Sequence, residues 1–222
     1  MKWILDNLDL IGELLVRHLW LSLPPILLSL VLAIPVAWLA NKVRWLRVPL
    51  VSLSSLMYAI PSLPLFIVLP LVLGTGIRDQ ANMVVALTLY GLALMVPASV
   101  DALGQVDRKV LDAAVAMGHP PVRRFLTVDL PLAGPTMLAG LRVVAVSTIS
   151  LVTVGAVLGI PSLGALFTDG FQRGIVEEIL TGLVVTALLA LLVDLLLARA
   201  GRLLLPWTAP VPLAVVEQEV GA

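Results

Sequence analysis

The sequence of 222 residues is 60% hydrophobic and 13% charged, and its mean hydropathy is +1.08. These values exclude an ordinary soluble domain, which needs a polar surface, and they predict helices that lie in lipid. The 14 basic and 14 acidic residues cancel, so the net charge gives no reason to expect a nucleic-acid partner. Cysteine is absent, which excludes disulfides and thiolate metal sites.

The amino-terminal segment, residues 1–17, has apolar residues at helical spacing and is too acidic for a signal peptide. Two interpretations are open. The segment is an amphipathic helix in the outer interface of the membrane, or it extends the first membrane span.

Five charge-free windows predict membrane-spanning helices, because a spanning helix needs about 20 apolar residues. The last window is short, but apolar residues continue past Asp194, so we interpret it as a span with Asp194 near one end. The predicted fold class is an all-α polytopic membrane protein, with a membrane domain over 18–205 and a short cytoplasmic tail over 206–222. The windows are 19–40, 48–77, 80–100, 143–168 and 179–193.

The second window contains Pro61, Pro64 and Pro70, which predict kinks or a break because proline removes a backbone donor. Broken helices at membrane depth face protein or a water-filled path, so functional and packing roles both remain open. Tyr58 and Tyr90 lie deep in their windows, where they either line a path for a cation or pack in the core. The candidate path residues are Tyr58, Pro61, Ser62 and Tyr90.

Basic residues are unequally divided between the two sets of loops, with nine on one side and four on the other. The positive-inside rule therefore predicts an external amino terminus and a cytoplasmic carboxyl terminus in the inner membrane of the cell. The first set contains Lys42, Arg44, Arg47, Arg108, Lys109, Arg123, Arg124, Arg199 and Arg202, and the second contains Lys2, Arg17, Arg78 and Arg173.

The longest internal loop runs from residue 101 to about residue 136. Apolar residues recur at helical spacing from Val106 to Met117, and Gly118 can supply a left-handed helix cap. Pro120 and Pro121 can begin a second short helix, whose end we place at Pro131 and Pro135. The loop is therefore predicted to be a helical hairpin exposed on the basic side of the membrane.

The spacing of residues in this loop resembles the EAA loop of ABC importer permeases, E-A-A-x3-G-x9-I-x-L-P. Asp112 stands in place of the family's Glu, and Val128 in place of Ile. Pro161-Ser162 departs from the paired glycines of many relatives. The chain is identified as a member of the binding-protein-dependent, methionine-importer-like family, and it resembles the glycine betaine, carnitine and choline branch. The branch resemblance lies in Ile60-Pro61-Ser62-Leu63, Leu89-Tyr90, Val106-Asp107, Leu132-Ala133, Ala139-Gly140-Leu141-Arg142 and the glycines Gly155, Gly159 and Gly164.

The resemblance implies that the loop couples the chain to a cytoplasmic ABC ATPase; the alternative is a solvated hairpin without a partner. It also implies a second permease, either the same chain or a paralogue, and an external substrate-binding protein. The implied substrate is a betaine-like or choline-like compatible solute, and the runner-up is an amino acid such as methionine. The implied coupling residues are Asp112, Ala113, Ala114, Gly118, Val128, Leu130 and Pro131.

No G-x-x-x-x-G-K-[ST] motif occurs, so we expect no cofactor in this chain and ATP bound by a partner subunit. No catalytic or metal site is predicted, because H-E-x-x-H and G-x-S-x-G are also absent and His18 and His119 are interpreted as interfacial or turn residues. A secondary transporter is the distant alternative. That class places ionisable groups at mid-membrane, whereas we place Asp101, Arg142 and Asp194 near the inner ends of spans.

Overall fold

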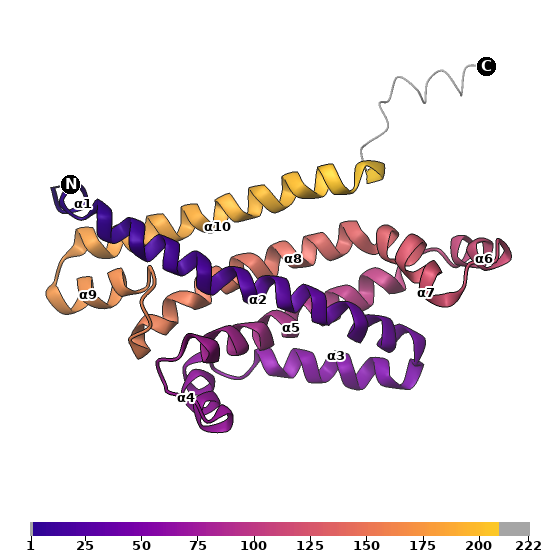
Figure 1. Cartoon of the computed structure of the whole chain (residues 1–222), viewed down its shortest axis with the longest axis horizontal. Helices are drawn as coiled ribbons and strands as arrows, with labels where there is room; N and C mark the ends of the chain where they lie inside the picture. The colour runs from indigo at the N-terminus through magenta and orange to yellow at the C-terminus, as the bar shows by residue number, and fades with distance from the viewer. Residues whose placement is uncertain (1, 209–222) are drawn as a thin grey trace, which may run out of the picture.

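The computed structural model describes residues 2–208, and all regular structure within that range is helical. Five long helices, α2, α3, α5, α8 and α10, run along the long axis of the molecule (Figure 1). The short helices α6 and α7 lie at one end of this bundle, and α9 lies at the other. The predicted all-α polytopic class is confirmed, while the predicted tail lies outside the described residues from 209 onward.

The first long helix, α2 (Leu8–Lys42), includes most of the amino-terminal segment, and only the single turn α1 (Lys2–Asp6) precedes it. Ile11 and Leu14 are buried and belong to one apolar cluster with Leu163 and Leu166. Residues 8–17 therefore extend the first span. His18, predicted to be interfacial, is instead fully buried, because it lies three turns into α2 with Nε2 3.0 Å from the carbonyl oxygen of Ile149.

The second predicted span is broken into α3 (Arg44–Tyr58) and α4 (Ser62–Leu73), which meet at an angle of 107°. Pro61 caps α4 with extended backbone, φ −62° and ψ 136°, so the helix cannot continue through it. The prolines thus predicted the break correctly. Among residues 2–208, four helices are long and apolar enough to cross a membrane, and the bent pair makes a fifth span if it counts as one.

The fourth predicted span is shifted toward the amino terminus. A π-helical turn (Phe125–Asp129) joins α7 (Pro121–Arg124) to α8 (Leu130–Val152), and a 3-10 segment (Thr153–Leu158) follows. The window 143–168 was therefore wrong, and so was the expected helix end at Pro131 and Pro135. Pro131 fits because it follows the wider π turn, in which the Leu130 N–H bonds to the Phe125 carbonyl instead of the usual i−4 partner.

The last span, α10 (Val176–Leu204), is longer than its window at both ends. Residues 195–204 follow Asp194 within the helix, so the prediction that Asp194 lies near one end was wrong. Arg142 likewise lies midway along α8. The charges of Arg142 and Asp194 were read as span boundaries, but the two side chains neutralise each other inside the bundle. The helix α9 (Ala165–Arg173) leads into α10 through Gly174, whose φ is +68°.

The bundle core lies where α2, α5 (Gln80–Gly104) and α8 pack together around small side chains such as Ala33, Ala37 and Ala145. Small residues let helix backbones approach closely in membranes, where packing rather than water drives association. A Cβ at Gly91 of α5 would lie 2.6 Å from the Ser29 Cβ of α2, so this crossing requires glycine. The outward face of α10 is apolar and exposed, as a lipid-facing surface should be.

Candidate coupling hairpin and membrane path

The hairpin begins with α6 (Arg108–Ala116), whose amino end is capped by Asp107. The Asp107 carboxylate accepts a hydrogen bond of 2.9 Å from the Lys109 N–H. At the other end, the Gly118 N–H bonds to the Val115 carbonyl and the His119 N–H to the Ala114 carbonyl. This pair of bonds, with φ +80° at Gly118, is a Schellman termination, as the sequence predicted.

One face of the hairpin is exposed and only part of it is polar. Asp112 and Ala113 are exposed, whereas Ala114 is buried against the rest of the hairpin. Val115 and Met117 are 54% and 71% exposed, which leaves apolar surface beyond the end of the bundle. An apolar surface with a carboxylate beside it suits a protein partner better than it suits water.

The second half of the EAA-like motif lies outside α6. Val128 belongs to the π turn, and Leu130 and Pro131 begin α8, where Leu130 packs against the bundle core. The structure therefore separates a largely exposed tip (Asp112 to Gly118) from a largely half-buried root (Val128 to Pro131) at the start of α8. The root lies within one helical rod, Pro121–Leu158, of 38 residues, which begins after the turn at Gly118 and His119. At 1.5 Å per residue the rod is about 57 Å long. The second half of the hairpin is therefore continuous with the spanning helix α8.

The four predicted path residues meet at the elbow between α3 and α4. The rings of Tyr58 and Tyr90 pack edge to face, with centroids 6.0 Å apart and planes at 85°. The Tyr90 hydroxyl donates a hydrogen bond to the Ile60 carbonyl, which the break in the helix leaves without an intrahelical donor. Pro61 and Ser62 follow directly and begin α4. Tyr90 of α5 therefore fixes the elbow.

The two tyrosines differ in exposure: Tyr90 is buried, but Tyr58 is 47% exposed. Pro61 is exposed and Ser62 is half-buried, so the elbow presents a ring and a hydroxyl beside each other. An exposed aromatic ring in a dry environment attracts cations through its π face. The arrangement can therefore contact a cationic solute without carrying a charge itself.

A half-buried charged pair joins α8 to α10 and was not predicted as a pair. Arg142 of α8 donates from Nε and Nη2 to the two carboxylate oxygens of Asp194 on α10, and both distances are 2.7 Å. Such a two-point contact fixes the guanidinium and the carboxylate in one plane. The residues are separated by 52 positions, so no local pattern indicated the contact.

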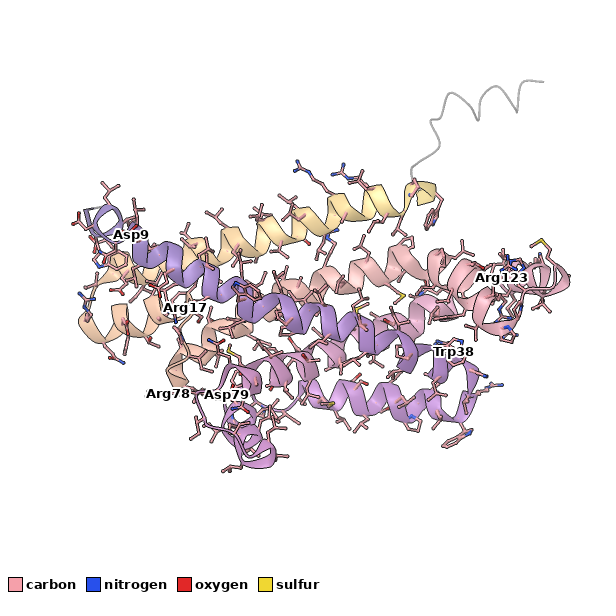
Figure 2. All side chains as sticks on the ribbon, viewed as in Figure 1. Asp9, Arg17, Trp38, Arg78, Asp79 and Arg123 are labelled. Atoms are coloured by element: carbon pink, nitrogen blue, oxygen red, sulfur yellow. The ribbon has the colours of Figure 1, made fainter. Side chains whose placement is uncertain are left out.

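The charges divide between the two ends of the bundle. In Figure 2, Asp9, Arg17, Arg78 and Asp79 lie toward one end, and Trp38 and Arg123 lie toward the other. The end that carries Trp38 and Arg123 also carries the hairpin and the carboxyl end of α10. Five of the nine basic residues of the first loop set line one cavity at the hairpin end, namely Lys42, Arg44, Arg47, Arg108 and Arg124.

The sequence matches the family described as "Binding-protein-dependent transport system inner membrane component" over residues 26–209. It is 30% identical to the osmoprotectant import permease protein OsmW of Salmonella typhimurium, over 92% of this chain and 96% of that protein. It is 28% identical to the glycine betaine/carnitine/choline transport system permease protein OpuCD of Bacillus subtilis, over 86% and 82% of the two chains. A third relative, the ergothioneine transport permease/ergothioneine binding protein EgtU of Helicobacter pylori, is 33% identical over 71% of this chain and 28% of its own length.

Among solved structures, the fold is similar to an inward-facing form of the MetNI methionine ABC transporter. The TM-score is 0.76 at 20% identity, and the match covers 90% of this chain and 98% of the other. This likeness concerns the fold alone. The chain therefore belongs to the binding-protein-dependent transport system inner membrane components, the permease subunits of ABC importers, and is a transport component rather than an enzyme.

Proposed function

We propose that this chain forms the membrane path of an importer for small solutes that carry a trimethylammonium group. The relatives are named for choline, glycine betaine, carnitine and ergothioneine, and all four compounds contain that group. The observation that carries the substrate class is the elbow, where the exposed ring of Tyr58 lies edge to face against Tyr90. Aromatic rings recognise quaternary ammonium groups through cation–π contact, which needs no buried anion.

The hairpin is proposed as the contact with a cytoplasmic ATPase subunit, where ATP is bound and hydrolysed. The exposed Asp112 offers a carboxylate for a basic residue, and Ala113 allows another backbone to approach. The half-buried root formed by Val128, Leu130 and Pro131 would then move with α7, because both belong to the continuous rod Pro121–Leu158. This supports a lever that converts closure of the ATPase into rotation of α8 within the bundle.

The complete importer is proposed to contain two permeases, two ATPase subunits and an external binding protein. The two permeases are either copies of this chain or this chain and a paralogue. The basic end that carries the hairpin is proposed to face the cytoplasm, with the amino terminus outside, because basic residues are retained on that side. The binding protein would then approach the end that carries α1 and α9.

Uptake in cells that lack other importers tests the substrate class. We expect the chain, expressed with its ATPase and binding protein, to support uptake of labelled glycine betaine, carnitine or choline, and vanadate to abolish it. The second candidate is methionine, suggested by the likeness of the fold to a methionine transporter. Uptake of methionine without any of the trimethylammonium compounds would replace the proposed substrate by an amino acid.

A further inference from the structure

A cavity of about 610 Å³ opens at the hairpin end of the bundle. It lies between the last turns of α2 and α5, the first turn of α3 and the root of the hairpin. Its lining is unusual for a membrane protein because it contains five cationic side chains and a single carboxylate. The cations are Lys42, Arg44, Arg47, Arg108 and Arg124, and the carboxylate is Asp129.

Only part of this charge is compensated. Arg47 pairs with Asp101 at 3.2 Å, and Arg124 pairs with Asp129 at 3.3 Å. Among residues 2–208, no ion pair involves Lys42, Arg44 or Arg108. Five cations against the two carboxylates leave an excess of three positive charges around one cavity. Such an excess attracts an anion.

The walls of the cavity are held in place by contacts that do not use the excess charges. Asn41 donates from Nδ2 to the carbonyls of Ala37 and Val100, both at 3.0 Å, and so ties α2 to α5. The Arg47 guanidinium lies beside Gly104, where an added Cβ would be in ordinary contact with it, 3.4 Å from Nη2. The cavity is therefore a formed site rather than a gap between mobile side chains.

The remaining wall is aromatic. Trp38 packs on Phe125 with ring centroids 5.9 Å apart, and Lys42 Nζ lies 4.7 Å from the centre of the Trp38 ring. Leu103, Val106 and Leu111 add apolar surface. The cavity thus combines cationic side chains with apolar surface at the ends of spanning helices. Tryptophan at such an end is typical of the membrane interface.

We propose that this cavity holds the phosphate headgroup of an anionic phospholipid. Guanidinium groups pair with phosphate oxygens at two points, and the apolar wall suits the glycerol and first acyl carbons. A free inorganic anion would leave the aromatic wall in contact with water. Basic pockets at the ends of spanning helices recognise anionic headgroups by this combination. The proposal does not depend on the transported substrate or on the ATPase.

Lipid binding to the purified chain in detergent tests the proposal. Phosphatidylglycerol is titrated and the bound lipid is counted by native mass spectrometry, for wild type and for the double variant R44Q/R108Q. Each basic residue near an anionic lipid contributes about 1 kcal/mol, so we expect roughly 30-fold weaker binding in the double variant. The matched control, R199Q/R202Q, removes two cations at the same end from outside the cavity.

The outcomes of this experiment distinguish a lipid headgroup in the cavity from other occupants. Wild-type affinity in R199Q/R202Q, weak affinity in R44Q/R108Q and weak binding of phosphatidylcholine support the headgroup. Equal loss in both double variants would overturn the proposal, because the effect would be one of overall charge. Displacement of the lipid by millimolar glycerol phosphate in wild type would also overturn it in favour of a soluble anion. Unchanged lipid binding in R44Q/R108Q would also overturn the proposal, because the lipid would then bind elsewhere on the chain.

Discussion

The Arg142 guanidinium of α8 and the Asp194 carboxylate of α10 face each other with two hydrogen bonds of 2.7 Å. Both residues lie well inside helices that cross the membrane, so each charge is stabilised mainly by the other. Asp194 is held by Arg142 alone among the ion pairs of residues 2–208. This contact therefore connects α10 to the helix that carries the hairpin.

Removing either charge leaves the other without its partner in the bundle. We expect Arg142→Leu and Asp194→Leu each to lower the melting temperature of the purified protein, and the double variant to recover most of the loss. Arg199→Leu is the control, since Arg199 is exposed on α10 and makes no ion pair among the described residues. Thermal unfolding in detergent measures all four. Additive losses in the double variant would contradict a direct pairing.

How much of the molecule the sequence predicts depends on the range of the interactions. The Gly118 turn and the Pro61 break were predicted because each is determined by a few neighbouring residues. The predicted span boundaries at Arg142 and Asp194 were wrong, because a charged residue indicates the end of a span unless its ion-pair partner is known. The partner lies 52 residues away.

The same reasoning applies to the candidate sites. The motif indicated the hairpin tip, but its root was taken for the end of a hairpin helix because Pro131 and Pro135 usually stop helices. The π turn before Pro131 removes that restriction and has no signature in the local pattern. Similarly, Tyr58 and Tyr90 were proposed as path residues separately, and only the fold shows their contact.

Gly164 provides a test of packing near the α9 end of the bundle. A Cβ at Gly164 would lie 2.7 Å from the Thr153 Cα and closer still to its carbonyl oxygen, and backbone cannot yield as a side chain can. We expect Gly164→Ala to reduce the folded fraction, because overpacking should lower the free energy of unfolding by roughly 1–3 kcal/mol. Gly12→Ala meets nothing within 4 Å and should be neutral or stabilising. Fluorescence-detected size exclusion compares the two, and equal profiles would refute this packing.

The elbow predicts a division of roles between its tyrosines. Tyr90→Phe removes the donor to the Ile60 carbonyl and should destabilise the elbow by about 1–3 kcal/mol. Tyr58→Leu removes an exposed ring and should weaken transport of a trimethylammonium solute roughly 2- to 30-fold, while Tyr58→Trp preserves it. Uptake kinetics at equal membrane abundance measure these effects. Unchanged uptake in Tyr58→Leu would place the path elsewhere.

Orientation can be tested directly because the chain contains no cysteine. Single cysteines at Arg44, Arg124 and Arg202 should react with an impermeant reagent only from the cytoplasm. Cysteines at Asp79, which Figure 2 shows toward the opposite end, and at Asp169 of α9, which lies at that end in Figure 1, should react only from outside. Reaction of Arg124→Cys from outside would reverse the proposed topology.

The coupling hairpin makes a more specific prediction about Gly118. A Cβ there meets nothing within 4 Å, so a substitution acts only through the backbone at φ +80°. Gly118→Val should introduce backbone strain of about 1–3 kcal/mol and change the direction of α6. Asparagine tolerates this conformation, so Gly118→Asn should have almost no effect. Gly118 lies beyond the bundle, so membrane insertion should be unaffected in both variants.

The measurement that tests the central claim most directly is co-purification of the ATPase together with substrate uptake for Asp112→Arg and Gly118→Val at wild-type membrane abundance. We predict that both variants lose uptake and that Asp112→Arg also loses the ATPase, because a positive charge replaces the exposed carboxylate at the proposed contact. Gly118→Asn should keep both properties. Normal uptake and a retained ATPase in Asp112→Arg and Gly118→Val would contradict the account and leave the hairpin without a coupling role.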